Sequence, residues 1–486
     1  MAMEDMLHPC LDLYFASPQW VKNSVGQAYS MVAGIARGRQ HAGFAAQAAL
    51  VAPEAVLALR TQKLRATLRH ALTSVPAYRD YHDLLTQLDA PHQVLAQLPL
   101  VCKERLRANP LQFMASTADP RARLKVSTGG STAVPMVFYL QKGVSRSREH
   151  AFIAAFHQRA GMQPGEIVLA LRGRSVPRAA CSAGRMWMYE PIKKELILSC
   201  DHLARSFMPS YVQAIRQWKP AFIQAYPSAI YPLARWLLDN PAPDISQRIR
   251  AIMLFSENVL PHHRQLLEAV FDCPILQHYG QSERVLMAGS MPDDPRYFFF
   301  PHYGHFELVD TAGRAVTTPG MPGEIVGTAF DNDVMSFIRF RTGDLAILGG
   351  PSHPLLPGYP VVERIEARLQ EFIVCNDRRL IAVNTLTTGH FADLENAEDV
   401  QFEQTTPGHL QVRVAPGARL SDQARRRIAQ ALEAKTQGGC AVEVIGVDRI
   451  ARTQRGKQRM LVQHLDLRAY FGAAPAAVAV DQQGTT

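Results

Sequence analysis

Residues 221–225, AFIQA, and residues 251–255, AIMLF, decide the fold. Each run is apolar and has the length of one strand, while residues 229–238 and 262–270 have the spacing of amphipathic helices. Strands that alternate with helices along a chain are typical of a largely parallel sheet covered by helices. The same alternation begins near residue 167, so the sequence predicts an α/β protein.

The chain on either side of this region has other patterns. The first part of the chain is helical in pattern, and beyond Tyr297 strands alternate with glycine and proline turns, which predicts a β subdomain. A loop rich in proline and glycine at residues 349–360 precedes a mixed region of strand and helix. We therefore expect a large N-terminal domain over residues 1–367, a small α+β domain over residues 368–471 and a frayed tail over residues 472–486.

The composition excludes several classes of protein. With 486 residues, 47% of them hydrophobic and 20% charged, the chain is long enough for two or three domains and too apolar for disorder. Its most alanine-rich stretch, residues 41–59, is interrupted by Gln47, Pro53 and Glu54, so we expect no membrane span. The acidic start lacks the pattern of a secretory signal, which predicts a cytoplasmic protein.

Charge and cysteine content also limit the function. The formal charge is +9, but lysines and arginines are dispersed, and the densest cluster, at residues 425–427, lies on an expected helix at residues 421–435. A solvated helix face explains this cluster better than a nucleic-acid site does, and the excess charge suits a polyanionic small molecule such as a nucleotide. The seven cysteines form no CxxC pair and no histidines have zinc-site spacing, so we expect reduced cysteines and no structural zinc.

Two segments of the first 300 residues carry groups suited to nucleotide chemistry. STGGSTAVP at residues 127–135 can present backbone N–H groups and hydroxyls to phosphate oxygens, although it lacks the Gly-Lys ending of a Walker loop. An ordinary glycine-serine loop explains it equally well. HYGQSE at residues 278–283 ends a strand with a ring that can stack on a base and a carboxylate that can hold Mg²⁺. A strand-end turn with an exposed Glu283 is the simpler alternative for this segment alone.

Two further segments follow. RTGD at residues 341–344 places Asp344 at a strand end, where a carboxylate can accept two hydroxyl protons from a ribose diol or can cap its own turn. RTQRGKQR at residues 452–459 places Lys457 on a glycine-containing loop, where its ammonium can neutralise charge on a phosphoryl oxygen. Taken alone, a basic loop of this kind is more often solvated surface.

In their order and spacing, the four segments resemble motifs of the adenylate-forming superfamily of acyl-CoA synthetases, adenylation domains and luciferases. They are similar to its phosphate loop, its Tyr-Gly-x-Ser/Thr-Glu turn, its Thr-Gly-Asp and its C-terminal Arg-Thr-x-x-Gly-Lys. The resemblance extends over residues 75–462. VPAY at residues 75–78, LPLVCK at 98–103 and GSTAVP at 130–135 are most similar to the phenylacetate-CoA ligase branch, which includes capsule-polysaccharide relatives and deazaflavin-adenylating synthetases.

The resemblance implies a ligase that uses ATP and Mg²⁺ to activate a carboxylic acid as acyl-AMP and passes the acyl group to an acceptor, expected to be CoA. It implies that Glu283 binds Mg²⁺, that Lys457 promotes adenylation, and that the small domain rotates about Gln370 between the two steps. Tyr226 is expected in the acid pocket, which favours an aromatic or other compact acid. The expected nucleotide contacts are Ser131, Thr132, Ser256, Glu257, Tyr279, Gly280, Ser282, Asp344 and Arg368.

The sequence also departs from the family pattern. Ala133 replaces the second glycine of the phosphate loop, Ala367 replaces the glycine before Arg368, and Gln370 replaces the Asp or Lys that is usual at the hinge. The expected metal, ribose and lysine positions are intact, so acid activation is still expected. An amine or a carrier-protein thiol stays open as the acceptor, and so does a catalytically idle nucleotide-binding protein.

Overall fold

The computed structural model describes residues 13–14, 17–36, 40–127, 136–172, 176, 185–200, 202–203, 205–368, 372–383, 386, 399–415, 420–451 and 459–467. These residues divide into two compact units. Unit 1 holds the described chain up to Thr342 together with residues 346–365, and unit 2 holds residues 343–345 and the described residues from 366 onward. Movement of residues 368–471 as a domain stays a prediction.

The centre of unit 1 is a parallel sheet, as the alternating pattern predicted. Its strands are β3 (Val168–Leu171), β5 (Glu195–Leu198), β6 (Phe222–Ala225), β7 (Ala251–Phe255) and β8 (Ile275–Gly280). They pair in parallel in the order β8-β7-β6-β3-β5, and β4 (Trp187–Glu190) closes the edge antiparallel to β5. Parallel neighbours need crossover connections, and helices provide several of them.

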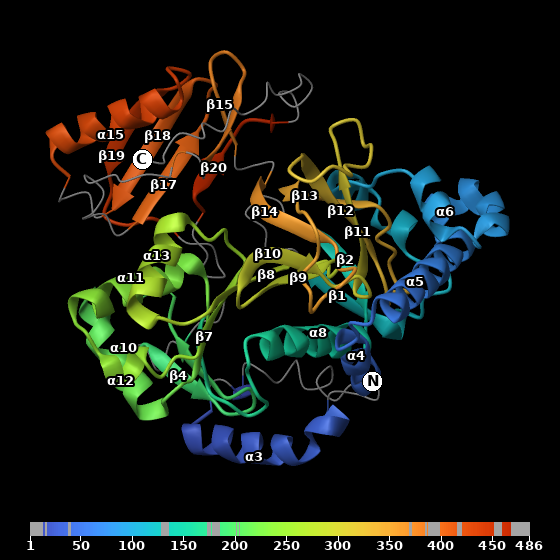
Figure 1. Cartoon of the computed structure of the whole chain (residues 1–486), viewed down its shortest axis with the longest axis horizontal. Helices are drawn as coiled ribbons and strands as arrows, with labels where there is room; N and C mark the ends of the chain where they lie inside the picture. The colour runs from blue at the N-terminus through green and yellow to red at the C-terminus, as the bar shows by residue number, and fades with distance from the viewer. Residues whose placement is uncertain are drawn as a thin grey trace. The chain divides into compact units, whose positions relative to one another are not determined.

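Helices cover the two faces of this sheet (Figure 1). On one face, α10 (Met208–Trp218), α11 (Pro227–Asp239) and α13 (Pro261–Phe271) enclose an apolar core with alternate residues of the strands. On the other face, Phe156 of α8 (Ser145–Arg159) packs in a second cluster with Phe222 and Met253. Because successive strand residues point to opposite faces, β3, β6, β7 and β8 contribute to both cores.

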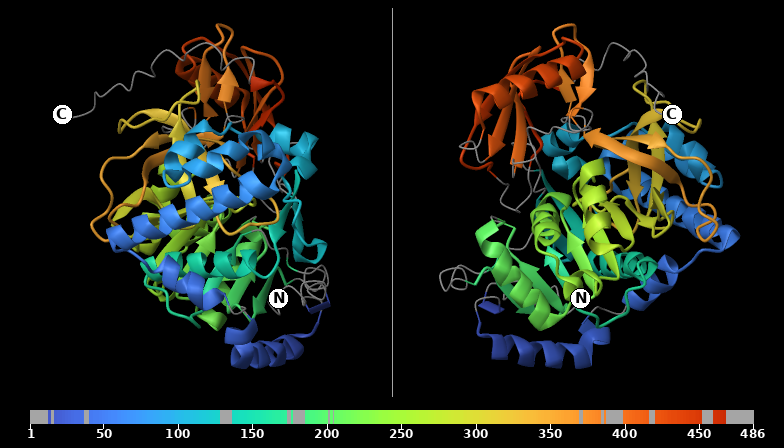
Figure 2. Two further views of the ribbon diagram at one scale, coloured as in Figure 1. Left: turned by 90° about the vertical axis from the view of Figure 1, so that its right-hand side faces the viewer. Right: turned by 60° about the vertical axis from the view of Figure 1, so that its left-hand side comes forward.

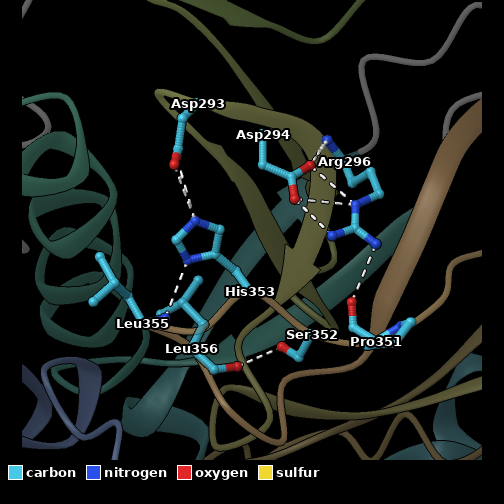
Figure 3. A network of polar contacts seen from close by, with 8 residues as sticks. All are labelled: Asp293, Asp294, Arg296, Pro351, Ser352, His353, Leu355 and Leu356. Carbon is cyan, nitrogen blue, oxygen red and sulfur yellow. Dashed lines mark hydrogen bonds and ion pairs between the residues drawn. The ribbon is translucent and has the colours of Figure 1, made fainter.

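Further strands continue the same hydrogen-bonded sheet beyond β8. They are β9 (Met287–Met291), β10 (Asp294–Phe299), β14 (Val361–Arg368), β13 (Phe340–Leu348), β12 (Pro322–Ala329) and β11 (Gly304–Val309) in spatial order. Figure 3 shows how the loop before β14 contacts the β9–β10 hairpin: Arg296 of β10 donates to the carbonyl of Pro351 at 3.1 Å, and His353 Nε2 lies 3.3 Å from an oxygen of Asp293 in the turn. A separate hairpin joins β1 (Arg123–Ser127) and β2 (Val137–Gln141).

The first part of the chain is helical, as expected, and proline sets several of its helix starts. Proline is the first residue of α5 (Pro53–Ser74), η2 (Pro76–Gln87), α6 (Pro91–Gln97) and η3 (Pro110–Phe113). A first-turn proline loses no hydrogen bond and has the backbone φ that the helix needs. Figure 2 shows α5 as a long blue helix across unit 1. The other helical segments are α3 (Gln19–Ala36), α4 (His41–Ala48), α7 (Lys103–Ala108) and η4 (Pro120–Ala122).

Unit 2 contains a four-stranded sheet and one long helix. The strand order is β19 (Ala441–Gly446), β18 (His409–Ala415), β17 (Asp399–Gln404) and β20 (Leu461–Gln463). The helix α15 (Asp422–Lys435) lies on one face of this sheet (Figure 1) and buries Ile428 and Leu432 against it. Its N-cap, Ser421, accepts a hydrogen bond from the Ala424 N–H at 3.2 Å, so the helix expected at residues 421–435 is confirmed.

A short hairpin, β15 (Phe372–Val374) with β16 (Leu380–Ala382), also belongs to unit 2. Among the described residues of both units, no helix has the length and apolar character that a membrane crossing requires.

Candidate functional site

The candidate site begins at one edge of the parallel sheet. In the register of β6, β7 and β8, Ala225 pairs with Leu254 and Phe255 pairs with His278. The carboxyl ends of the three strands therefore reach the same edge, where Tyr226, Ser256 and Tyr279 follow one another across the sheet. In open α/β sheets this edge is the usual place for a ligand.

Residues 279–286 form a turn that is braced by its own side chains. Gln281 donates from Nε2 to the Tyr279 hydroxyl at 2.7 Å, and its Oε1 accepts from the Leu286 N–H at 3.1 Å. The Tyr279 ring packs edge-on against Phe299, with 5.6 Å between ring centroids. These contacts between protein groups hold the turn in its shape without a bound ligand.

Residues near the start of α8 form hydrogen bonds with the 279–286 turn. The buried Arg148 guanidinium donates to the Arg284 carbonyl at 2.6 Å, and Arg284 donates to the Ser145 hydroxyl at 2.6 Å. Arg284 has a φ of 54°, in the left-handed region that is costly for a side chain of this kind. Arg148 also donates to the Phe330 carbonyl and lies 3.6 Å from an Asp331 oxygen. The strained turn thus depends on a buried arginine that the motif analysis did not indicate.

Glu283 is the carboxylate of this turn. It is 3% exposed, and its Oε1 accepts no hydrogen bond from the described residues. The Lys103 ammonium, at the start of α7, lies 3.5 Å from that oxygen. A buried carboxylate is stable only beside a cation or a hydrogen-bond donor, so this oxygen suits a hard cation such as Mg²⁺. Lys103 was part of a branch motif in the sequence, but its pairing with Glu283 was missed because the two residues are far apart in the chain.

Glu257 links the end of β7 to the start of α11. Its two carboxylate oxygens accept from the Ser228 N–H at 3.0 Å and from the Ser228 hydroxyl at 3.1 Å. A carboxylate at a helix N-terminus satisfies a free N–H and interacts well with the helix dipole. Ser256, just before it, has a φ of 65° and so turns the chain sharply at the sheet edge. The expected contact of Ser256 and Glu257 with adenine stays a prediction.

The other expected site residues differ in exposure and in location, and some lie outside the described residues. Ser282 is half-buried, and Gly280 is exposed on the turn. Asp344 is 5% exposed on β13, in the stretch 343–345 that groups with unit 2. Tyr226 is buried in the core below α10, α11 and α13. Arg368 ends β14, but its side chain lies outside the described residues, as do Ser131, Thr132, Gln370 and Lys457.

Solved structures share this fold. A 2-hydroxyisobutyryl-CoA ligase in the postadenylation state matches with a TM-score of 0.64, at 17% identity over 86% of this chain and 92% of that chain. An acyl acid amido synthetase, AtGH3.15, in complex with 2,4-DB matches with a TM-score of 0.55, at 14% identity over 85% of this chain and 94% of that chain. At these identities the likeness concerns the fold, which is the fold of the adenylate-forming ligases.

The sequence is also similar to curated proteins, among them two phenylacetate-coenzyme A ligases. It is 24% identical to Protein CapK of Staphylococcus aureus over 315 residues, which are 63% of this chain and 66% of CapK. It is 26% identical to phenylacetate-coenzyme A ligase of Pseudomonas putida over 313 residues, which are 60% of this chain and 67% of that protein. The corresponding ligase of Escherichia coli K12 is 24% identical over 378 residues, covering 74% of this chain and 78% of that protein.

These matches confirm the resemblance to the adenylate-forming superfamily and to its phenylacetate-CoA ligase branch. By sequence and fold the chain is therefore similar to the adenylate-forming acid ligases. The chain spans just under two thirds of the length of CapK. No family model matches the sequence.

Proposed function

We propose that this protein activates a carboxylic acid with ATP and transfers the acyl group to CoA. A carboxylate oxygen of the acid attacks the α-phosphorus of ATP, the bond to the bridging oxygen breaks, and pyrophosphate leaves. The CoA sulfur then attacks the acyl carbon, and AMP leaves with the electrons of the broken carbon–oxygen bond. The phenylacetate-coenzyme A ligases named among the relatives support this proposal.

The proposal rests on the position and burial of the Glu283 carboxylate. Its carboxylate is buried at the carboxyl edge of the parallel sheet, with Oε1 free of hydrogen bonds from the described residues and close to Lys103. Glu283 would hold Mg²⁺ together with substrate phosphates, and the bound ion would neutralise phosphate charge. Lys103 keeps the carboxylate in place. In this proposal Tyr279, Ser282, Asp344 and Arg368 bind the nucleotide, and Lys457 stabilises charge during adenylation.

The proposal also covers the identity of the acid and of the acyl acceptor. We favour an aromatic or other compact acid, because aromatic residues are numerous at the edge where β6, β7 and β8 end: Tyr226, Phe255 and Tyr279 follow one another there. CoA is the proposed acceptor. An amine or a carrier-protein thiol would use the same adenylation step, so the products distinguish the three acceptors.

ATP–pyrophosphate exchange with a panel of carboxylic acids tests the first half-reaction. At least one compact acid should support Mg²⁺-dependent exchange, and adding CoA should release AMP with an acyl-CoA product visible by mass spectrometry. Exchange without a CoA product, but with an amide or an acylated carrier protein, would replace CoA as acceptor. No exchange with any acid would overturn the proposed function.

A further inference from the structure

A polar cluster lies on the face of the parallel sheet that α8 covers. Its members are His157 of α8, Gln224 of β6, His278 of β8 and Arg172, the residue after β3. Apart from Glu195 of β5, the neighbouring strand residues on this face are apolar and include those of the second core of unit 1. All four residues belong to unit 1, and none of them has a part in the nucleotide contacts discussed above.

Several polar atoms of this cluster lack partners among the described residues. Gln224 is 2% exposed; its Nε2 lies 2.8 Å from His157 Nε2, and its Oε1 has no hydrogen-bond partner. Reversing the amide would only exchange which of its two atoms is unpaired. His278 Nε2 and Arg172 Nε are also buried without a partner. Folded proteins rarely leave buried polar atoms unpaired, because each one costs free energy.

The cluster has aromatic neighbours and adjoins the proposed nucleotide site. The His278 ring packs against both Phe156 and Phe255, with centroid distances of 5.3 and 4.8 Å. The Arg172 guanidinium lies 5.5 Å from the centre of the Phe255 ring. His278 directly precedes Tyr279, so the cluster begins where the expected base contact ends. A compact acid whose carboxylate faces the nucleotide would direct its other end here.

The charges of the cluster are balanced inside the protein. Arg172 forms an ion pair with Glu195 at 3.0 Å. Burial, with a further contribution from Arg172, lowers the pKa of His157 to about 4; burial, followed by His157 and Arg172, lowers the pKa of His278 to about 3. Both rings are therefore neutral at pH 7. The cluster offers a donor at Arg172, an acceptor or donor at Gln224 and a neutral imidazole, but no unbalanced positive charge for a second carboxylate.

A hydroxyl group matches this arrangement, since it donates one hydrogen bond and accepts others without charge. Resting on the proposed function, we propose that the acid is an aryl acid that carries a hydroxyl substituent, and that Gln224, His278 and Arg172 bind this hydroxyl beside the Phe156 and Phe255 rings. The same geometry would disfavour the unsubstituted acid, because the polar atoms would stay unpaired after it binds.

Matched acids test the proposal in the exchange assay. Benzoate and phenylacetate should be compared with their 2-, 3- and 4-hydroxy derivatives and with the corresponding dicarboxylates. At least one hydroxy acid should exceed its unsubstituted parent by about tenfold or more in kcat/KM. Parents that equal every hydroxy derivative, or a preference for a dicarboxylate, would overturn the inference while leaving the ligase function standing. No exchange with any acid would overturn both.

The variant Gln224→Met assigns the contact. It should lower kcat/KM for the preferred hydroxy acid about tenfold or more and leave the parent acid unchanged or better, so the ratio collapses. Gln277→Met is the matched control: Gln277 lies one residue before His278, on the opposite face, and bonds Tyr297 and Pro295. It should keep the ratio. If Gln224→Met does not fold, His278→Phe replaces it with the same expectation. An unchanged ratio in the folded variant would overturn the assignment.

Discussion

Glu283 carries more of the proposed chemistry than any other described residue. Glu283→Gln keeps the size of the side chain but replaces a charged ligand oxygen with an amide, which binds a hard cation poorly. We expect the variant to fold and to lose Mg²⁺-dependent ATP–pyrophosphate exchange by roughly a hundredfold, the size of other single electrostatic deletions. Glu268→Gln, at a partly exposed position on α13, is the control and should keep full exchange. Normal exchange in Glu283→Gln would remove Glu283 from the metal site.

Five histidines of unit 1, two of them buried and three half-buried, make its stability depend on pH. Burial lowers the pKa of each to about 3 or 4, below the value of an unfolded histidine. Below about pH 6.5 the unfolded state binds protons that the folded state does not, so the free energy of unfolding falls as the pH falls, by up to about 1.4 kcal/mol per pH unit for each histidine. The five are His157, His263, His278, His302 and His305.

Urea unfolding between pH 7.5 and 5 measures this effect. All four tryptophans lie in unit 1, so their fluorescence reports its unfolding. His302 is fully buried beside Phe152 and Phe300, and His302→Phe should lower the slope by about the share of one histidine. A slope that does not change would mean that His302 protonates equally in the two states.

At the scale of elements, hydrogen bonds of Arg148 couple α8 to the turn at 279–286. Arg148→Leu leaves the carbonyls of Arg284 and Phe330 without their buried donor, and it leaves Asp331 without one of its cations. We expect a loss of about 3 kcal/mol in the free energy of unfolding, together with weaker Mg²⁺–ATP binding. Arg216→Leu on α10, where the arginine pairs with Asp244 at the surface, should change the unfolding midpoint little.

Calorimetric titration of Mg²⁺–ATP into the folded Arg148→Leu protein separates the two effects. Binding as tight as in the parent protein would show that the turn keeps its shape without α8. We expect Arg148→Lys to bind Mg²⁺–ATP more tightly than Arg148→Leu does. Lysine keeps a charged donor at this position, although it does not have the two forked N–H groups of arginine.

For the whole molecule, the resemblance predicts that the two half-reactions depend on different residues. Lys457→Ala should slow acyl-AMP formation roughly a hundredfold or more, yet transfer the acyl group from prepared acyl-AMP at nearly the parent rate. Gln370→Pro should have the opposite pattern, because proline fixes φ and hinders rotation about this residue. Equal loss of both half-reactions in Lys457→Ala, with the circular dichroism spectrum unchanged, would contradict the two-conformation mechanism.

The sequence predicted most of this fold because local patterns determine its elements. The apolar runs at 221–225 and 251–255 are β6 and β7, and proline marks the start of several helices. The contacts that shape the site were not predictable in this way. Lys103 with Glu283, and Arg148 with Arg284, join residues that only the tertiary fold brings together. The unpaired atoms of Gln224 and His278 likewise depend on packing that no local pattern contains.

During synthesis on the ribosome, Lys103 and Arg148 are made long before the residues that they contact in the folded protein. Two of these partners are consecutive residues: Glu283 lies by Lys103, and the Arg284 carbonyl accepts from Arg148, which also contacts Phe330 and Asp331. When this one turn reaches its place, it gives α7 its carboxylate and α8 its carbonyl acceptor in a single event. A transient opening of this turn in the finished protein would therefore break one polar contact of α7 and one of α8 at the same time, while Arg148 keeps its contacts with Phe330 and Asp331.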